Sequence, residues 1–195
     1  MSSINALSTG QGGIVYTADS TGNLILQASG TSIATISPTG LTMNSGNIVQ
    51  AASAAPAFSA YQNSAQTIST STWTKINFDT KEFDTNNNFA SDRFTPTIEG
   101  YYNLHAAVRI DNNIGTGERM IVIYKNGSEY KRGYNTKGSA AVGDSWFQMS
   151  ISCLVYANGT TDYFEVYVMH GAGVNRSLTG GTQFTYFQGS MARGG

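Results

Sequence analysis

Short apolar runs separated by turn-forming residues recur along the whole chain, and no stretch carries apolar residues at helical spacing. From residue 58 onward the runs reach strand length, and several alternate apolar with polar side chains. A period of two turns one side of a strand to a core and the other to solvent. The pattern predicts strands at 58–61, 73–78, 101–110, 118–125, 128–134, 146–156, 162–170 and 183–192.

Two Asn-Gly pairs mark sharp turns between these runs. Asn126-Gly127 separates two strand-like runs and predicts a tight hairpin, because both residue types accept a positive φ. Asn158-Gly159 repeats the same signal. About eight strands with turns between them are typical of an antiparallel β-sandwich or jelly roll. We therefore expect an all-β protein.

The composition agrees with this fold class. Charged residues make up 12% of the 195 residues, about half of the roughly 25% that is typical of globular domains. Lys and Glu, which favour solvated helix surfaces, are scarce, whereas the chain has 22 glycines. The net charge of −1 argues against non-specific nucleic-acid binding, which needs a basic surface.

Charge divides the chain into two regions. Asp19 is the only charged side chain before Lys75. Strands as short as those expected in residues 1–50 do not enclose a core within one chain, so we expect them to pack against other chains. Residues 51–56 are interpreted as a linker, and residues 57–195 as a second domain. The apolar runs of the first region are 13–16, 24–26, 33–36 and 41–43.

Nothing in the sequence indicates export or membrane insertion. The N-terminus has no basic segment followed by an apolar one, and no run approaches the roughly 18 apolar residues of a membrane span. We expect synthesis in a cytoplasm. The single cysteine, Cys153, lies in a strand-like run and is interpreted as a buried apolar residue.

Residues suited to catalysis or metal binding are few. His105 and His170 lie in strand-like runs without metal-ligand spacing, so we expect structural roles. An acidic stretch could bind Ca²⁺ or supply the two carboxylates of a glycosidase, but a solvated turn is the favoured interpretation. We expect no enzyme activity, no metal and no cofactor. The acidic stretch comprises Asp79, Glu82, Asp84 and Asp92 with Asn86, Asn87 and Asn88.

The hairpin near residue 130 is the candidate receptor-binding surface. Aromatic side chains next to cations suit sugars or anionic polymers, because Tyr is large and amphipathic and Arg binds carboxylate and phosphate. The alternative is an ordinary hairpin with its aromatic residues packed inward. The candidates are Tyr130, Lys131, Arg132 and Tyr134.

Several segments of residues 57–193 follow one another in an order typical of one domain family. They are Ala57-Phe58-Ser59-Ala60, Thr74-Lys75-Ile76-Asn77-Phe78, Arg93-Phe94-Thr95-Pro96, Glu99-Gly100-Tyr101-Tyr102, Tyr124-Lys125-Asn126-Gly127, Asn158-Gly159 with Phe164-Glu165-Val166, and Phe187-Gln188-Gly189-Ser190-Met191. On these segments, residues 57–193 resemble the C1q/TNF-like jelly-roll domain. The resemblance implies a homotrimer, and aromatic strand positions that match the family make Tyr102, Phe164 and Phe187 the candidate trimer-interface residues.

The first region resembles segments of phage fibre and other virion proteins, on residues 21–31 and 36–40. The two resemblances together predict a structural protein of a tailed-phage virion, made in the host cytoplasm. We expect a trimeric fibre or tail protein that is attached to other virion proteins through residues 1–50 and contacts host surface glycans. The alternative is a capsid decoration or head-fibre protein that attaches to the capsid shell and stabilises it.

Overall fold

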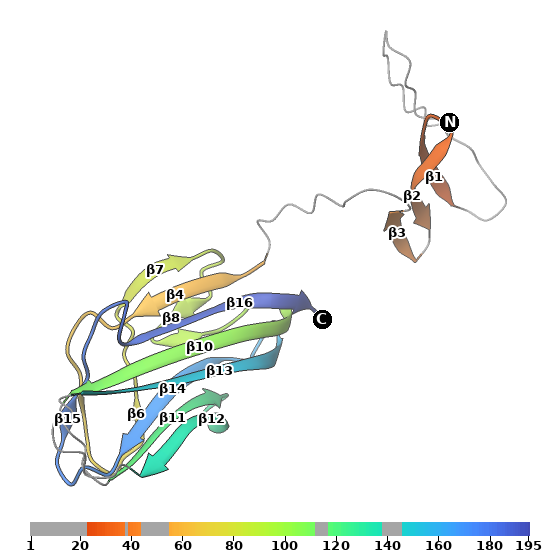
Figure 1. Ribbon diagram of the computed structural model, residues 1–195. Helices are drawn as coiled ribbons and strands as arrows, with labels where there is room; N and C mark the ends of the chain where they lie inside the picture. The colour runs from red at the N-terminus through yellow and green to blue at the C-terminus, as the bar shows by residue number, and fades with distance from the viewer. Residues whose placement is uncertain (1–22, 38, 44–54, 112–116, 138–145) are drawn as a thin grey trace. The chain divides into compact units, whose positions relative to one another are not determined.

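The computed structural model describes residues 23–37, 39–43, 55–111, 117–137 and 146–195. The chain forms two units, Met1–Ala52 and Ser53–Gly195. Every regular element in the described ranges is a strand, which confirms the all-β prediction (Figure 1). The described ranges contain no helix that could cross a membrane.

The first unit contains a small antiparallel sheet in the order β1-β2-β3. Ser29 and Gly30 connect β1 and β2, and both have a positive φ (50° and 78°), which suits a tight hairpin. The three apolar runs predicted within residues 24–43 are confirmed as strands, whereas the run 13–16 lies outside the described residues. The strands are β1 (Leu24–Ala28), β2 (Thr31–Ser37) and β3 (Gly40–Met43).

The second unit is a jelly roll of two facing antiparallel sheets. The first, here called the five-stranded sheet, has the order β13-β10-β16-β4-β7. The C-terminal strand therefore lies between β10 and β4, next to the first strand of the unit. Its strands are β4 (Ala57–Tyr61), β7 (Thr80–Asp84), β10 (Glu99–Asp111), β13 (Trp146–Asn158) and β16 (Tyr186–Gly194).

The second sheet, here called the six-stranded sheet, has the order β12-β11-β14-β9-β8, with β6 also paired to β14. A separate short pair joins β5 (Thr67–Ile68) to β15 (Arg176–Ser177). The strands of the six-stranded sheet are β6 (Thr74–Lys75), β8 (Phe89–Ala90), β9 (Arg93–Phe94), β11 (Glu118–Lys125), β12 (Ser128–Lys137) and β14 (Phe164–His170).

An aromatic cluster fills the space between the two sheets. The Phe58 ring stacks on Phe94 with centroids 4.3 Å apart, and Phe187 meets it edge-on at 5.0 Å. Such offset and edge-to-face pairs add to the free energy gained by burying the rings. Gly189 has no side chain where Phe58 and Leu104 approach the backbone, so the cluster packs close to β16.

This core corrects the expected trimer-interface residues. Tyr102, Phe164 and Phe187 are fully buried within the single chain. Their side chains point between the two sheets and have no surface left for a second copy. The family-derived prediction was right that these positions are buried aromatic residues, but wrong about what buries them.

The two Asn-Gly signals have different outcomes. Asn126 and Gly127, both at positive φ, join β11 to β12 as predicted. Asn158-Gly159 does not form a hairpin, because β13 and β14 belong to different sheets. The turn instead carries the chain from one sheet to the other. Of the predicted strand 73–78 only β6 is regular, although Ile76 and Phe78 are buried in the core.

Candidate interaction surfaces

The outward side of the five-stranded sheet has few charged side chains over its central part, where the Glu82 carboxylate of β7 accepts a hydrogen bond from Ser59. Strand alternation turns Tyr102 and Leu104 into the core, so Tyr101, Asn103 and His105 face outward. The facing positions on β13 are Tyr156, Leu154 and Ser152 in the same register. On β16 and β4 the outward positions are Tyr186, Gln188, Ser190, Tyr61, Ser59 and Ala57.

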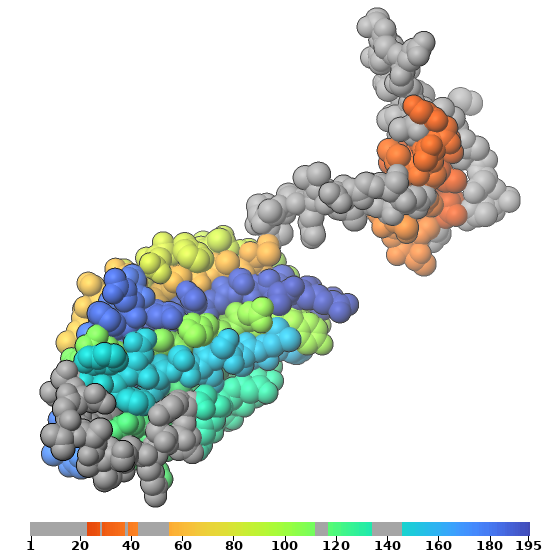
Figure 2. All heavy atoms as spheres, viewed as in Figure 1, coloured from red at the N-terminus to blue at the C-terminus, as the bar shows by residue number. Residues whose placement is uncertain are grey.

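Large apolar groups are exposed on this side. Leu154 is 56%, Phe83 51% and Tyr101 43% exposed, although each is a residue type that gains by burial. In Figure 2, β4, β16, β10 and β13 run side by side as orange, blue, green and cyan bands. Between Phe83 and His105 lies an open hollow of about 270 Å³. Exposed apolar groups on one sheet side make it a candidate interaction surface. Leu154 and Phe83 lie on its two edge strands, with polar residues of β10 and β16 between them.

One polar pair on this side is ordered within the chain. The Nε2 atom of His105 lies 3.1 Å from the hydroxyl of Tyr186, with the two rings 5.5 Å apart. The pair spans neighbouring strands β10 and β16 and gives the sheet a polar centre between its apolar residues. His105 thus has a structural role in the contact between β10 and β16. The other histidine, His170, lies at the end of β14 and is fully buried.

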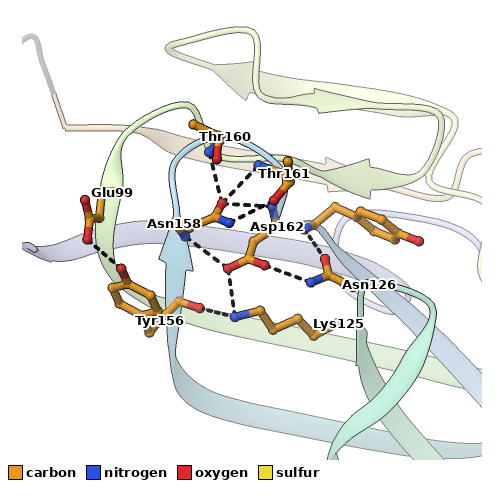
Figure 3. Close-up of polar contacts among 9 residues, drawn as sticks. Glu99, Lys125, Asn126, Tyr156, Asn158, Thr160, Thr161 and Asp162 are labelled. Carbon is orange, nitrogen blue, oxygen red and sulfur yellow. Dashed lines mark hydrogen bonds and ion pairs between the residues drawn. The ribbon is translucent and has the colours of Figure 1, made fainter.

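A network of polar contacts closes one end of this sheet (Figure 3). The Tyr156 hydroxyl donates to Glu99 at 2.5 Å, which raises the pKa of Tyr156. Lys125 donates to the Tyr156 carbonyl at 2.8 Å and pairs with Asp162 at 2.8 Å. Burial raises the pKa of Asp162, but hydrogen bonds from Lys125, Asn126 and the Asn158 amide outweigh it, so the pKa lies below its usual range.

The same network explains the second Asn-Gly pair. The side-chain oxygen of Asn158 accepts hydrogen bonds from the amides of Thr160, Thr161 and Asp162 at 2.9–3.0 Å. Asn side chains favour turns because they can satisfy nearby backbone amides in this way. Gly159, at φ 70°, leaves no room for a side chain against the backbone of Glu99. The residues therefore build a structural turn, with their polar groups satisfied by each other.

The outward side of the six-stranded sheet differs in character. Aromatic rings lie on it, but Tyr124 and Tyr167 stack on each other at 4.1 Å and the Arg132 guanidinium lies 5.7 Å from the ring of Trp73. Lys75 and Arg93 both pair with Glu165 at 2.8–2.9 Å. Burial raises the pKa of Glu165, but these two cations outweigh it and lower the pKa. On the outward side of the six-stranded sheet, these aromatic rings and charged groups therefore already contact partners within the chain.

Of the predicted receptor-binding residues, Arg132 and Lys131 lie on opposite sides of strand β12, although both line the hollow beside Cys153. Arg132 turns to this outer side, where it binds Glu129 through two nitrogens at 2.7 and 2.8 Å. Lys131 faces the other way, with its ammonium 5.1 Å from the Tyr130 ring, and lines a hollow with Cys153 between β12 and β13. Tyr134 belongs to β12, but its side chain lies outside the described part.

The acidic stretch consists of separate turn-stabilising groups. Asp79 accepts the amides of Asn63 and Ser64, and Asp84 accepts the amides of Asn88 and Phe89. Glu82 accepts a hydrogen bond from the Ser59 hydroxyl, and Asp92 accepts one from the Phe78 amide. In the described ranges, no group of three or more His, Cys, Asp or Glu is placed to hold a metal ion.

Cys153 is only partly buried. Its strand position turns it toward the core, where it packs against the apolar cluster. Burial raises the pKa of the thiol, and the nearby Lys131 lowers it by a smaller amount. The prediction of a buried apolar residue is right in direction but overstates the burial, because the gap between β12 and β13 opens beside it.

Sequence reasoning missed the exposed residues Phe83, Tyr101, Leu154 and Tyr156. The sequence of residues 101–106 predicts a strand whose side chains alternate between two faces, but it does not tell which face is buried. Either choice places a tyrosine, Tyr101 or Tyr102, in the core. Strand β7, which carries Phe83, was not predicted, because its residues 80–84 read Thr-Lys-Glu-Phe-Asp and contain a single apolar side chain. Only the pairing of β10 with both β13 and β16 determines which tyrosine faces out.

Comparison with known proteins identifies the fold alone. No family model matches the sequence, and no curated protein matches it. Crystal structures of murine APRIL at pH 5.0 and pH 8.5 match with TM-scores of 0.52 and 0.50, at 11% and 12% identity. Each match covers 70% of this chain and 98% of the APRIL chain. A structure of Eiger TNF from S. frugiperda matches at a TM-score of 0.44 and 12% identity, over 72% of this chain and 93% of that chain.

APRIL and Eiger are TNF-family jelly-roll proteins. The sheet order and the APRIL structures together establish that the second unit is an antiparallel β jelly roll of the TNF-like type.

Proposed function

We propose that this chain is a homotrimeric, non-enzymatic structural protein of a tailed-phage virion, a fibre or tail protein whose jelly roll assembles through the outward side of the five-stranded sheet. The observation that carries the trimer is the exposure of Phe83, Tyr101 and Leu154 on the outward side of the five-stranded sheet. Closed cyclic packing would bury these groups and end growth at a defined size.

The virion assignment rests on the resemblance of residues 21–31 and 36–40 to phage fibre segments and on the scarcity of charge before Lys75. A first region that is short-stranded and uncharged suits a segment covered by other chains. With the five-stranded sheet covered, the edge strand β12 stays accessible. Tyr130 and Lys131 on this strand are the proposed contacts with host surface glycans, and weak contacts gain avidity when many copies are displayed.

Light scattering tests the assembly. The wild-type chain should have about three times the 20.8 kDa mass of one chain. Leu154→Arg places a charge on the proposed interface and should give monomers with an unchanged circular dichroism spectrum. Thr72→Arg, an exposed site outside the five-stranded sheet, is the matched control and should stay trimeric. A monomeric wild type would refute the proposal.

Immunogold labelling tests the location. Antibodies against the purified chain should label the fibres or tail of particles produced by the phage whose genome encodes it. Labelling spread over the head would instead establish the alternative, a capsid decoration or head-fibre protein. Absence of label from intact and disrupted particles would exclude both virion functions.

A further inference from the structure

We infer that the hollow between β12 and β13 binds a carboxylate-bearing sugar, with the Lys131 ammonium as the counter-charge of the carboxylate. The hollow has a volume of about 350 Å³ and opens between the edge strands of the two sheets. It is lined by residues 131–133 of β12 and 150–153 of β13. The inference rests on the proposed glycan contact at Tyr130 and Lys131, and it names the class of glycan.

The backbone of β12 is shaped around this hollow. Its register against β11 shifts between Ile123 and Tyr124, which leaves Tyr130 as an extra, bulged residue. Bulges change the direction of the side chains beside them and are common next to binding sites. A Cβ on Gly133 would lie 2.6 Å from that of Ile151, so only a glycine lets β12 and β13 meet at this wall of the hollow.

Lys131 is the surplus cation of this region. Lys125 pairs with Asp162 at 2.8 Å and Arg132 pairs with Glu129 at 2.7 Å, so these two cations already have their counter-ions. Lys131 has no carboxylate at ion-pair distance in the described ranges. None of the described residues that line the hollow is acidic. An anion in the hollow is therefore attracted by Lys131 without repulsion from its walls.

The thiol of Cys153 indicates where the ammonium points. Lys131 lowers the pKa of Cys153, so its charge lies close to a thiol that itself lines the hollow. Burial raises the pKa of the thiol by a larger amount and keeps it neutral at pH 7. No thiolate therefore competes with an anionic ligand for the ammonium.

The other groups around the hollow suit a sugar better than a simple anion. Ser150 and Ser152 are exposed, and neither hydroxyl has a hydrogen-bond partner among the described residues. A hydroxyl both donates and accepts, as the hydroxyls of a sugar require. The Tyr130 ring is 43% exposed and lies 5.1 Å from the Lys131 ammonium, where it can pack on the apolar face of a sugar.

Isothermal titration calorimetry of the full chain with trigalacturonic acid tests the inference. The methyl ester of the same sugar keeps the rings without the charge and is the matched ligand control. Lys131→Gln should weaken binding of the acid about tenfold, because a charge-assisted hydrogen bond is lost, and Lys131→Arg should restore most of it. Arg193→Gln, at an exposed site on β16, makes the same change in net charge and should bind like the wild type.

Alkylation of the wild-type chain locates the bound sugar. Cys153 is the single cysteine of the sequence and lines the hollow. Trigalacturonic acid should therefore slow its reaction with iodoacetamide, and the methyl ester should not. A reaction rate that saturating acid leaves unchanged would place the bound sugar elsewhere and overturn the inference.

Three further results would overturn the site: no binding of the acid by the wild type, equal binding of the ester, or equal loss in Lys131→Gln and Arg193→Gln. Tighter binding of inorganic phosphate than of trigalacturonic acid would overturn the sugar as the ligand. Light scattering of the same samples separates the site from the proposed function. Trimers that do not bind would overturn the site alone, whereas monomers whose binding depends on Lys131 would overturn the trimer alone.

Discussion

The ammonium group of Lys125 lies 2.8 Å from the carboxylate of Asp162, and the pair joins the β11–β12 hairpin to the turn between the two sheets. Both side chains are largely buried, at 19% and 9% exposure. Asp162 also accepts hydrogen bonds from Asn126 and from the amide of Asn158. One carboxylate thus joins the turn at 158–162 to residues 125 and 126, which are distant from it in sequence.

Replacing this carboxylate should destabilise the jelly roll. Asp162→Asn should lower the free energy of unfolding at pH 7 by about 2 kcal/mol, because it leaves Lys125 without its counter-ion in a partly buried position. Because the folded-state pKa of Asp162 is lowered, the wild-type advantage is full above the unfolded value near 3.8 and falls as the pH drops through the folded value. Urea unfolding at pH 7 and pH 3 measures both effects.

Thr160→Ala is the control for this variant. Thr160 lies in the same turn, but its contact with Asn158 uses the backbone amide, which alanine retains. Its unfolding midpoint should stay close to that of the wild type. Equal destabilisation by both changes would show that the turn, rather than the ion pair, is sensitive to substitution.

Gly189→Ala should strain the core. A Cβ at this position would lie 2.6 Å from a Leu104 methyl and 2.9 Å from the Phe58 ring. Overpacking of a filled core costs about 1–3 kcal/mol, so the thermal midpoint should fall by several degrees. Gly194→Ala, at the end of the same strand with open space around it, should have little effect. Calorimetry of the two variants makes the comparison.

Phe187 and Phe83 should behave in opposite ways. Phe187 is fully buried in its own chain, so Phe187→Ala should reduce the free energy of unfolding by about 3–5 kcal/mol through the lost contacts and the cavity. Phe83→Ala should leave the fold intact but weaken the trimer, because Phe83 is exposed in the single chain. Denaturant unfolding and sedimentation equilibrium distinguish the two effects. Loss of assembly with an unchanged fold in Phe187→Ala would contradict its placement.

His170 should make stability depend on pH in mild acid. Burial lowers its pKa below 6.5, and its Nδ1 atom accepts from the Ala172 amide, which leaves Nε2 to donate to the Ile68 carbonyl. As the pH falls below about 6.5, the unfolded chain binds a proton that the folded chain excludes. Stability should therefore fall by up to about 1.4 kcal/mol per pH unit until the folded value is reached. Urea midpoints between pH 7.5 and 5 measure this slope, and His170→Gln should flatten it.

The residue pair Tyr101 and Tyr102 illustrates what strand patterns predict and where they stop. Alternation placed one of the two in the core, and the resemblance to the C1q/TNF family selected Tyr102 as an aromatic strand position. It could not say whether that position faces the core or another chain. The burial of Tyr102 between the sheets, where its hydroxyl reaches the Ile98 carbonyl at 2.6 Å, decides for the core.

The two Asn-Gly pairs show the same limit for turns. Both Asn-Gly pairs have the same local preference for a positive φ, because this preference depends only on the residues within the turn. Asn126-Gly127 joins two strands of one sheet, whereas Asn158-Gly159 connects strands of different sheets. That difference comes from the partners of β13 and β14, which are distant in sequence: β13 pairs with β10, whereas β14 pairs with β11 and β6.

The sequence by itself determined the fold class, most of the longer strands and the hairpin at Asn126-Gly127, because alternation and positive-φ residues act over a few neighbouring residues. Only the tertiary structure decided which side of each strand is buried, that Arg132 and Lys131 face apart, and that Leu24, Ile36 and Leu41 share one side of a sheet. These facts depend on strand order and register, and a shift of register by a single residue exchanges the two faces of a strand.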